Sequence, residues 1–278
     1  MNDTFAVRRM LVVVEAASGE PEAVRAAAGI AARLGAELDV LVIENVDLLR
    51  VSGMPYVRHV TMPGEGAAFE LGALEREMRS FATRVRRLLE EVQAGAPLTW
   101  SMQVRRGQLV REITAAAERA DLVVLETMSR PLVPQLRIAS AAREAIAGLL
   151  RPVFLMPPRM AAAEHVLVLY EEGAHADKAL GAAAGFARAT GADLVVLAHA
   201  PTEEAGRALE ERAARILAAA GVEGSIRRTA RADAAHLCAL AQERPNTLLV
   251  LSAEDLAGRD ERERALIDRL DCPLLVVS

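Results

Sequence analysis

An internal repeat constrains this chain more than any single motif, because residues 11–44 and residues 167–200 share one pattern. Placing Gly35 on Gly191, an offset of 156 positions (191 − 35 = 156), aligns the two segments without a gap. The identical pairs include Leu11 and Leu167, Val12 and Val168, Glu15 and Glu171, Ala23 and Ala179, Gly29 and Gly185, Leu38 and Leu194, and Val40 and Val196. The chain is therefore predicted to hold two copies of one structural unit.

The length agrees with two units, because 278 residues divide into two domains of common size, about 100 to 150 residues each. The adjacent Pro157 and Pro158 interrupt the chain between the copies. We therefore predict a first domain at 1–158, which carries an insertion at 46–69, and a shorter second domain at 159–278.

Short apolar runs alternate with segments of helical spacing in both copies, which favours parallel sheets joined by right-handed crossovers. In the first copy we expect strands at 10–15, 38–44, 99–105, 122–125 and 152–156, and helices at 21–34, 71–94, 109–119 and 138–150. In the second copy we expect strands at 165–170, 194–199, 224–229, 248–251 and 273–277, and helices at 176–190, 203–220, 234–243 and 261–270. The predicted fold class is α/β, with two tandem doubly wound parallel five-stranded sheets.

Five segments carry a pattern that is specific in its order: 10–15 followed by Ser18, 31–38, 120–125, 151–155 and the ending 271–278. In these segments and in the order of its elements, the chain resembles the universal stress protein family over nearly its whole length. The resemblance implies an adenine nucleotide alpha hydrolase-like fold, in which the last strands of two units meet across a pseudo-two-fold axis. Within one tandem chain this pairing would give an intramolecular pseudo-dimer, and a further homodimer remains an alternative.

Nucleotide-binding members of that family carry G-x-x-G, nine residues, then G-[ST], after the fourth strand. The spacing persists in the first copy, but Glu126, Ser129 and Ala139 replace the glycines, and Ser140 alone matches. Glycines there let backbone N–H groups approach phosphates, which side chains obstruct and the carboxylate of Glu126 repels. In the second copy the corresponding loop is five residues shorter and holds one glycine. ATP binding is therefore expected to be lost.

The candidate cofactor-binding residues form a degenerate nucleotide pocket, made of Glu15, Ser18, Glu126, Thr127, Ser129, Ala139 and Ser140. Glu15 stands where the family usually has an aspartate. A cation or amine could lie between Glu15 and Glu126, or Arg130, Arg137 or water could neutralise them. The histidines have no ligand partners at metal-binding spacing, so we expect no metal.

Charge and composition limit the partners. A net charge of −5 without a basic block argues against nucleic acid and membrane surfaces, and no apolar run reaches the roughly 20 residues that span a bilayer. The absence of a signal peptide and two cysteines expected as buried thiols indicate a cytoplasmic protein.

The arginine-rich stretch 76–87 is predicted to be a solvated helix face with Glu/Arg pairs. The insertion 46–69 could be a lid, a partner patch or a flap on its own domain.

Three functions follow as hypotheses from these features. The main hypothesis is a non-catalytic universal stress protein, a regulatory or stress-response binding module with no cofactor and an unknown protein partner or small ligand. The alternative is an adenine-nucleotide-binding stress sensor, holding ATP or AMP through a loop without glycines in the first domain. A pathway enzyme is the third, but no G-x-S-x-G or other catalytic constellation can be read from the sequence, so no catalytic residue is named.

Overall fold

A computed structural model describes residues 6–17, 20–47, 58–60, 66–68, 71–126, 151–157, 160, 162–257 and 272–278, with the backbone alone at 58–60, 66–68, 71 and 73. The first half holds β1 (Arg9–Glu15), α1 (Pro21–Leu34), β2 (Glu37–Asn45), β3 (Arg58–Val60), β4 (Gly66–Ala68), α3 (Leu71–Gly95), β5 (Trp100–Gly107), α4 (Leu109–Ala117), β6 (Leu122–Glu126) and β7 (Val153–Met156). The second half holds β8 (His165–Tyr170), α6 (Ala174–Thr190), β9 (Asp193–His199), α7 (Glu203–Ala220), β10 (Gly224–Thr229), α8 (Ala234–Glu243), β11 (Thr247–Ser252), α9 (Ala253–Ala257) and β12 (Leu274–Val277).

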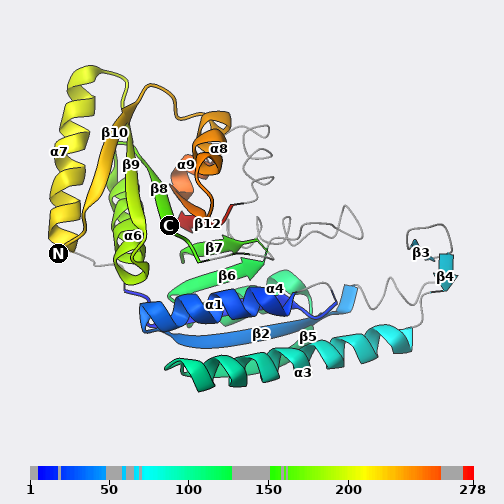
Figure 1. Ribbon diagram of the computed structural model, residues 1–278. Helices are drawn as coiled ribbons and strands as arrows, with labels where there is room; N and C mark the ends of the chain where they lie inside the picture. Colours follow the sequence, from blue (N-terminus) through cyan, green and yellow to red (C-terminus); the bar gives the residue numbers. More distant parts are fainter. Residues whose placement is uncertain are drawn as a thin grey trace.

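The two five-stranded sheets expected from the sequence are the two halves of one continuous ten-stranded sheet (Figure 1). Its order is β10-β9-β8-β11-β12-β7-β6-β1-β2-β5, so each half repeats the same order outward from the centre. Neighbouring strands are parallel except β7 and β12, which pair antiparallel where the halves meet. The repeated units are thereby joined by backbone hydrogen bonds into one layer.

Apolar side chains explain why β7 and β12 lie at the centre of the sheet. β12 is buried throughout and β7 is buried at three of its four residues, so an exposed edge here would leave apolar surface in water. Phe154 of β7 is fully buried and stacks on Phe186 of α6, with ring centroids 6.1 Å apart. A side chain of the first half therefore packs into the core of the second.

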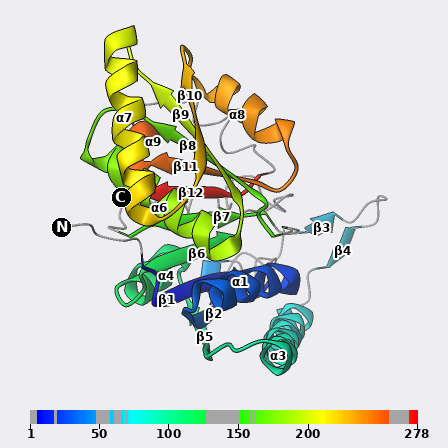
Figure 2. The ribbon, with the colours of Figure 1, turned by 60° about the vertical axis from the view of Figure 1, so that its left-hand side comes forward.

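The helices form a layer on each face of the sheet (Figure 2). On one face α1, α3, α6 and α7 cover a single core that runs through both halves, and α1 contacts α6 directly. On the other face α4 covers a core of the first half, while α8 covers a separate core of the second half. The halves therefore share their apolar core on one face.

The aligned glycines of the repeat end the first helix of each half. Gly35 follows α1 with φ 65°, and Gly191 follows α6 with φ 74°. Both conformations are left-handed, a region that residues with a Cβ enter at a cost of roughly 1 kcal/mol or more. Glycine thus occurs at both positions because each helix ends in a left-handed conformation.

Some features differ from the sequence-based expectation. The insertion 46–69 contains an antiparallel pair of strands, β3 and β4, which was not predicted. The three readings of this insertion stay predictions, because its side chains from position 48 to 69 lie outside the described residues. The expected helices at 138–150 and 261–270 also lie outside them. Cys238 and Cys272 are half-buried rather than buried. Within the described ranges, no helix has the length and apolar character needed to cross a bilayer.

Candidate functional site

The strand order reverses direction between β1 and β6. From β1 the chain proceeds outward to β2 and β5, and it then returns to β6 on the other side of β1. In open α/β sheets ligands bind beyond the carboxyl ends of the strands at such a point. Glu15 ends β1 and Glu126 ends β6, so these two predicted residues lie at this edge. The other predicted site residues are outside the described part of the chain: Ser18, Thr127, Ser129, Ala139 and Ser140.

Glu126 is held at the N-terminal end of α1. Both of its carboxylate oxygens accept from the backbone N–H of Glu20, at 3.1 and 3.2 Å. Glu20 is the residue that precedes the helix, and Pro21 at the first helical position has no N–H to offer. The carboxyl group of Glu126, on a residue with 3% of its surface exposed, therefore occupies the backbone donor beside this helix terminus.

Burial raises the pKa of Glu126 to about 7, because the charged carboxylate loses its hydration. The Glu20 N–H bond lowers this pKa, and the nearby carboxylates of Glu20 and Glu15 raise it further. No basic side chain in the described ranges lies within ion-pair distance of Glu126. Near neutral pH the group is consequently divided between its acid and its carboxylate.

Glu15 lies on the same edge, with 2% of its surface exposed. Its Oε1 accepts from Nδ2 of Asn45 at 2.8 Å, and Oδ1 of Asn45 accepts from the backbone N–H of Asp47 at 3.0 Å. Asn45 ends β2, next to β1 in the sheet, and sequence reasoning missed it. The signal in the sequence that could have identified Asn45 is its side-chain amide at the end of a buried apolar strand. The two arginines proposed to neutralise this edge, Arg130 and Arg137, lie outside the described residues.

In the second half the strand order reverses direction between β8 and β11, and different polar groups lie at the end of β11. Ser252 ends β11 in the place of Glu126 and is buried. Its Oγ accepts from the N–H of Asp255, while Oδ2 of Asp255 accepts from the N–H of Ser252, both at 3.0 Å. This reciprocal pair begins α9, a short helix that sequence reasoning missed. The turn after β11 thus satisfies its own donors.

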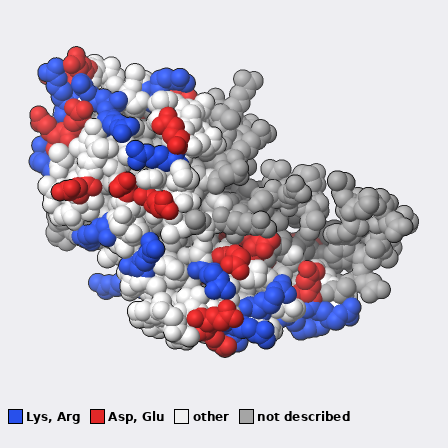
Figure 3. Space-filling view, in the orientation of Figure 1, with Lys and Arg blue, Asp and Glu red and all other residues white. Residues whose placement is uncertain are grey.

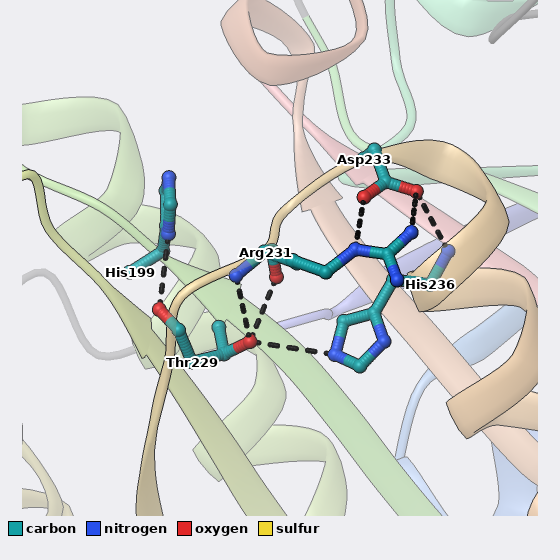
Figure 4. Close-up of polar contacts among 5 residues, drawn as sticks. All are labelled: His199, Thr229, Arg231, Asp233 and His236. Carbon is teal, nitrogen blue, oxygen red and sulfur yellow. Dashed lines mark hydrogen bonds and ion pairs between the residues drawn. The ribbon is translucent and has the colours of Figure 1, made fainter.

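A second polar cluster lies across the ends of β9 and β10 (Figure 4). His199 Nδ1 is 3.1 Å from the carbonyl oxygen of Thr229, and His236 Nε2 is 3.3 Å from Thr229 Oγ1. Arg231 donates two hydrogen bonds to Asp233, whose carboxylate also accepts from the N–H of His236 and so caps α8. The cluster binds the end of β10 to α8.

The carboxylates near the histidines of this half were not foreseen from sequence. His199 Nε2 lies 3.8 Å from Glu171 Oε1, and His175 Nε2 lies 2.8 Å from Glu254 Oε1. In the described part of the chain, no group of three or more histidine, cysteine, aspartate or glutamate side chains is arranged to hold a metal ion.

Tyr170 anchors the remaining polar network of the second half. Its hydroxyl donates to Oδ1 of Asp177 at 2.7 Å, and Asp177 also pairs with Arg212. Burial, with the hydrogen bond to Asp177, raises the pKa of Tyr170 well above its usual value. These contacts join the end of β8 to α6 and α7, and sequence reasoning missed them.

Comparison with known proteins identifies the fold. No family model matches the sequence, and no curated protein matches it. A universal stress protein from Archaeoglobus fulgidus DSM 4304 superposes with a TM-score of 0.68 at 16% identity, covering 96% of each chain. A protein from Pseudomonas aeruginosa UCBPP-PA14 assigned to the same family gives 0.60 at 17%, covering 99% of this chain and 95% of its own.

A third similar structure is the cytoplasmic domain of a prokaryotic cation chloride cotransporter, with a TM-score of 0.56 at 14% identity, covering 97% of this chain and 94% of that one. Over nearly its whole length, the chain therefore has the fold of the universal stress proteins.

Proposed function

We propose that this chain is a non-catalytic stress-response protein of the universal stress type, a binding module whose first half has lost ATP binding. The observation that carries the proposal is the contact between the Glu126 carboxylate and the Glu20 N–H beside α1. A phosphate group would use a free backbone donor at such a helix terminus. Here an acidic side chain of the protein itself already occupies this donor.

Charge opposes a phosphate at this edge as well. Glu15, Glu20 and Glu126 are close enough for the first two to raise the pKa of the third. An incoming polyanion would meet this group of carboxylates in a poorly hydrated setting, where like charges repel more strongly than in water. Nucleotide binding would therefore require both the displacement of Glu126 and the neutralisation of its neighbours.

The second half offers no more favourable place for a phosphate. The N–H groups of Ser252 and Asp255 already donate to each other's side chains, and Asp255 adds a carboxylate.

The adenine-nucleotide sensor remains the competing function, because the spacing of the loop after β6 is kept. The role in stress response is drawn from the fold resemblance, which does not by itself specify a ligand.

Titration with ATP, ADP and AMP, with and without magnesium, tests the proposal by calorimetry and thermal shift. We expect no binding up to millimolar nucleotide. Binding tighter than about 10 μM would raise the free energy of unfolding by about 2.7 kcal/mol at a hundredfold excess over Kd, and this result would favour the sensor.

Two variants of Glu126 separate occupancy from charge. Glu126→Ala frees the Glu20 N–H and removes the carboxylate, so ADP affinity at pH 8 should rise about tenfold, or ~1.4 kcal/mol. Glu126→Gln removes the charge but keeps an oxygen on that N–H, and its affinity should rise less. Equal affinities in the two variants would show that charge, rather than occupancy, excludes the nucleotide.

A further inference from the structure

The exposed side of α3 carries a row of arginines. Arg76, Arg79, Arg86 and Arg87 are all exposed, and no acidic residue occurs between positions 78 and 89. Figure 3 shows basic side chains gathered along the lower side of the molecule, over α3. At a rise of 1.5 Å per residue, positions 76 to 87 extend over about 16 Å of the helix surface. We call these four residues the α3 arginine row.

Two of the acidic residues of α3 that could pair with this row are used elsewhere. Glu75 is four residues before Arg79, but it pairs with Arg106 of β5 at 3.5 Å. Glu91 is four residues after Arg87, but it pairs with Arg25 of α1 at 3.4 Å. Tertiary contacts have thus taken two of the partners that a helix would normally supply at this spacing. The third, Glu90, is four residues after Arg86 and forms no ion pair with the arginines of this helix in the described ranges.

The arginine row therefore lacks ionic partners within the described ranges, where no carboxylate lies within 4.0 Å of any of its four guanidinium groups. The prediction of Glu/Arg pairs on this helix face is wrong for these four residues. Arg84, the remaining arginine of the stretch, donates to Ser80 Oγ and lies over the ring of Phe81.

The opposite side of α3 keeps the row in place. Met78, Phe81 and Val85 are buried in the core on that side, with at most 1% of their surface exposed. Because the helix cannot rotate without exposing these side chains, it holds its arginines as a fixed array on the outer surface. A rigid array of guanidinium groups loses less entropy on binding than arginines on a flexible segment.

We propose that the α3 arginine row docks an acidic segment of a partner protein, one that places several carboxylates within about 16 Å. Guanidinium groups bind carboxylates through paired N–H donors, and arginine clusters are a recurring receptor for acidic motifs. Glu77 and Glu90 lie near the two ends of the row, so the favourable surface is short. A segment of a few acidic residues matches this length.

Longer polyanions fit the surface less well. A nucleic acid strand would extend onto Glu77 and Glu90, and Phe81, the aromatic residue of α3, is buried and cannot stack on a base. A membrane-surface helix inserts its apolar side, whereas that side of α3 is already in the core. The net charge of −5 also opposes attraction to an extended anionic surface.

Binding of fluorescein-labelled poly-L-glutamate to the full chain, followed by anisotropy at low and moderate salt, tests the proposal. We expect saturable binding that weakens as salt rises, because exposed charges are screened beyond a Debye length of about 10 Å at 0.1 M. Arg79→Glu with Arg87→Glu should weaken it at least about tenfold, since two attractive contacts become repulsive. Arg76→Gln with Arg86→Gln should weaken it less and leaves the helix-forming propensity unchanged.

The matched control is Arg111→Glu with Arg119→Glu, which changes the total charge equally at exposed positions on and just after α4, across the sheet. This control should bind like the wild type, and circular dichroism melts should show that all variants are folded. Equal loss in the control, or no binding by the wild type, would overturn the proposal. Tighter binding of polyuridylate or of phosphatidylglycerol vesicles than of polyglutamate would instead assign the row to RNA or membrane.

Discussion

Replacing Glu126 with glutamine should remove a large part of the pH dependence of stability. The pKa of this carboxyl group is raised from 4.5 to about 7 in the folded chain. Between these values the native state keeps a proton that the unfolded state has released. The contribution of Glu126 to the free energy of unfolding is therefore fully present below pH 4.5. It falls as the pH rises towards 7 and changes little above pH 7.

The size of the effect follows from the shift. A rise in pKa from 4.5 to about 7, at about 1.36 kcal/mol for each pH unit, changes the free energy of unfolding by about 3 kcal/mol between these two pH values. Between pH 5 and pH 8, where most of this change occurs, the wild type should lose about 2 to 3 kcal/mol through Glu126. Glutamine does not titrate and can still accept the Glu20 N–H bond, so the variant should lose little stability at pH 5 and gain it at pH 8.

Urea unfolding at pH 5 and pH 8, followed by circular dichroism, measures this difference for wild type and Glu126→Gln. Glu118→Gln is the matched control, because Glu118 is exposed at the end of α4. The quantity that matters is the change between the two pH values in the free-energy difference between variant and wild type. If this change is under about 0.5 kcal/mol, the carboxyl group of Glu126 is not held near neutrality and the reasoning fails.

Three further changes probe the site, the junction and the backbone by urea or thermal unfolding. Asn45→Ala removes one hydrogen-bond donor to the buried Glu15 and should cost about 1 to 3 kcal/mol at pH 8; a neutral result would show that the remaining contacts of this carboxylate are sufficient. Phe154→Ala should cost about 3 to 5 kcal/mol, and a cost below about 1 kcal/mol would mean that its stacking on Phe186 does not hold the halves together. Asn246 has φ 57°, so Asn246→Ala should cost about 1 kcal/mol and Asn246→Gly clearly less, whereas equal costs would exclude a conformational cause.

Local pattern was sufficient to predict most elements of this fold. The expected strands and helices match the described ones within two residues at nearly every end, because each apolar run or helical period reflects which side of the chain the sheet covers. Gly35 and Gly191 could be identified as helix ends, since a left-handed residue leaves a mark in the sequence. The pair of strands β3 and β4 has no such period and was missed.

Long-range contacts account for what could not be predicted. Asn45 is separated from Glu15 by 30 positions, and Glu20 from Glu126 by 106. No spacing rule predicts either pair, because Glu15, Asn45 and Glu126 end parallel strands at one edge of the sheet and Glu20 precedes the helix that begins there. The pKa of Glu126 likewise depends on burial, which a sequence does not state.

By itself, the amino-acid sequence determined the repeated α/β unit, the strand that ends in Glu15 and the loss of the glycines after β6. These properties depend on residue type and on neighbours along the chain. The tertiary structure alone decided that the two sheets join through β7 and β12, that Glu126 takes the Glu20 N–H, and that Glu75 and Glu91 leave the α3 arginine row without them. Each of these depends on which donors and charges the folded chain brings within a few ångströms, and distance along the sequence does not determine that.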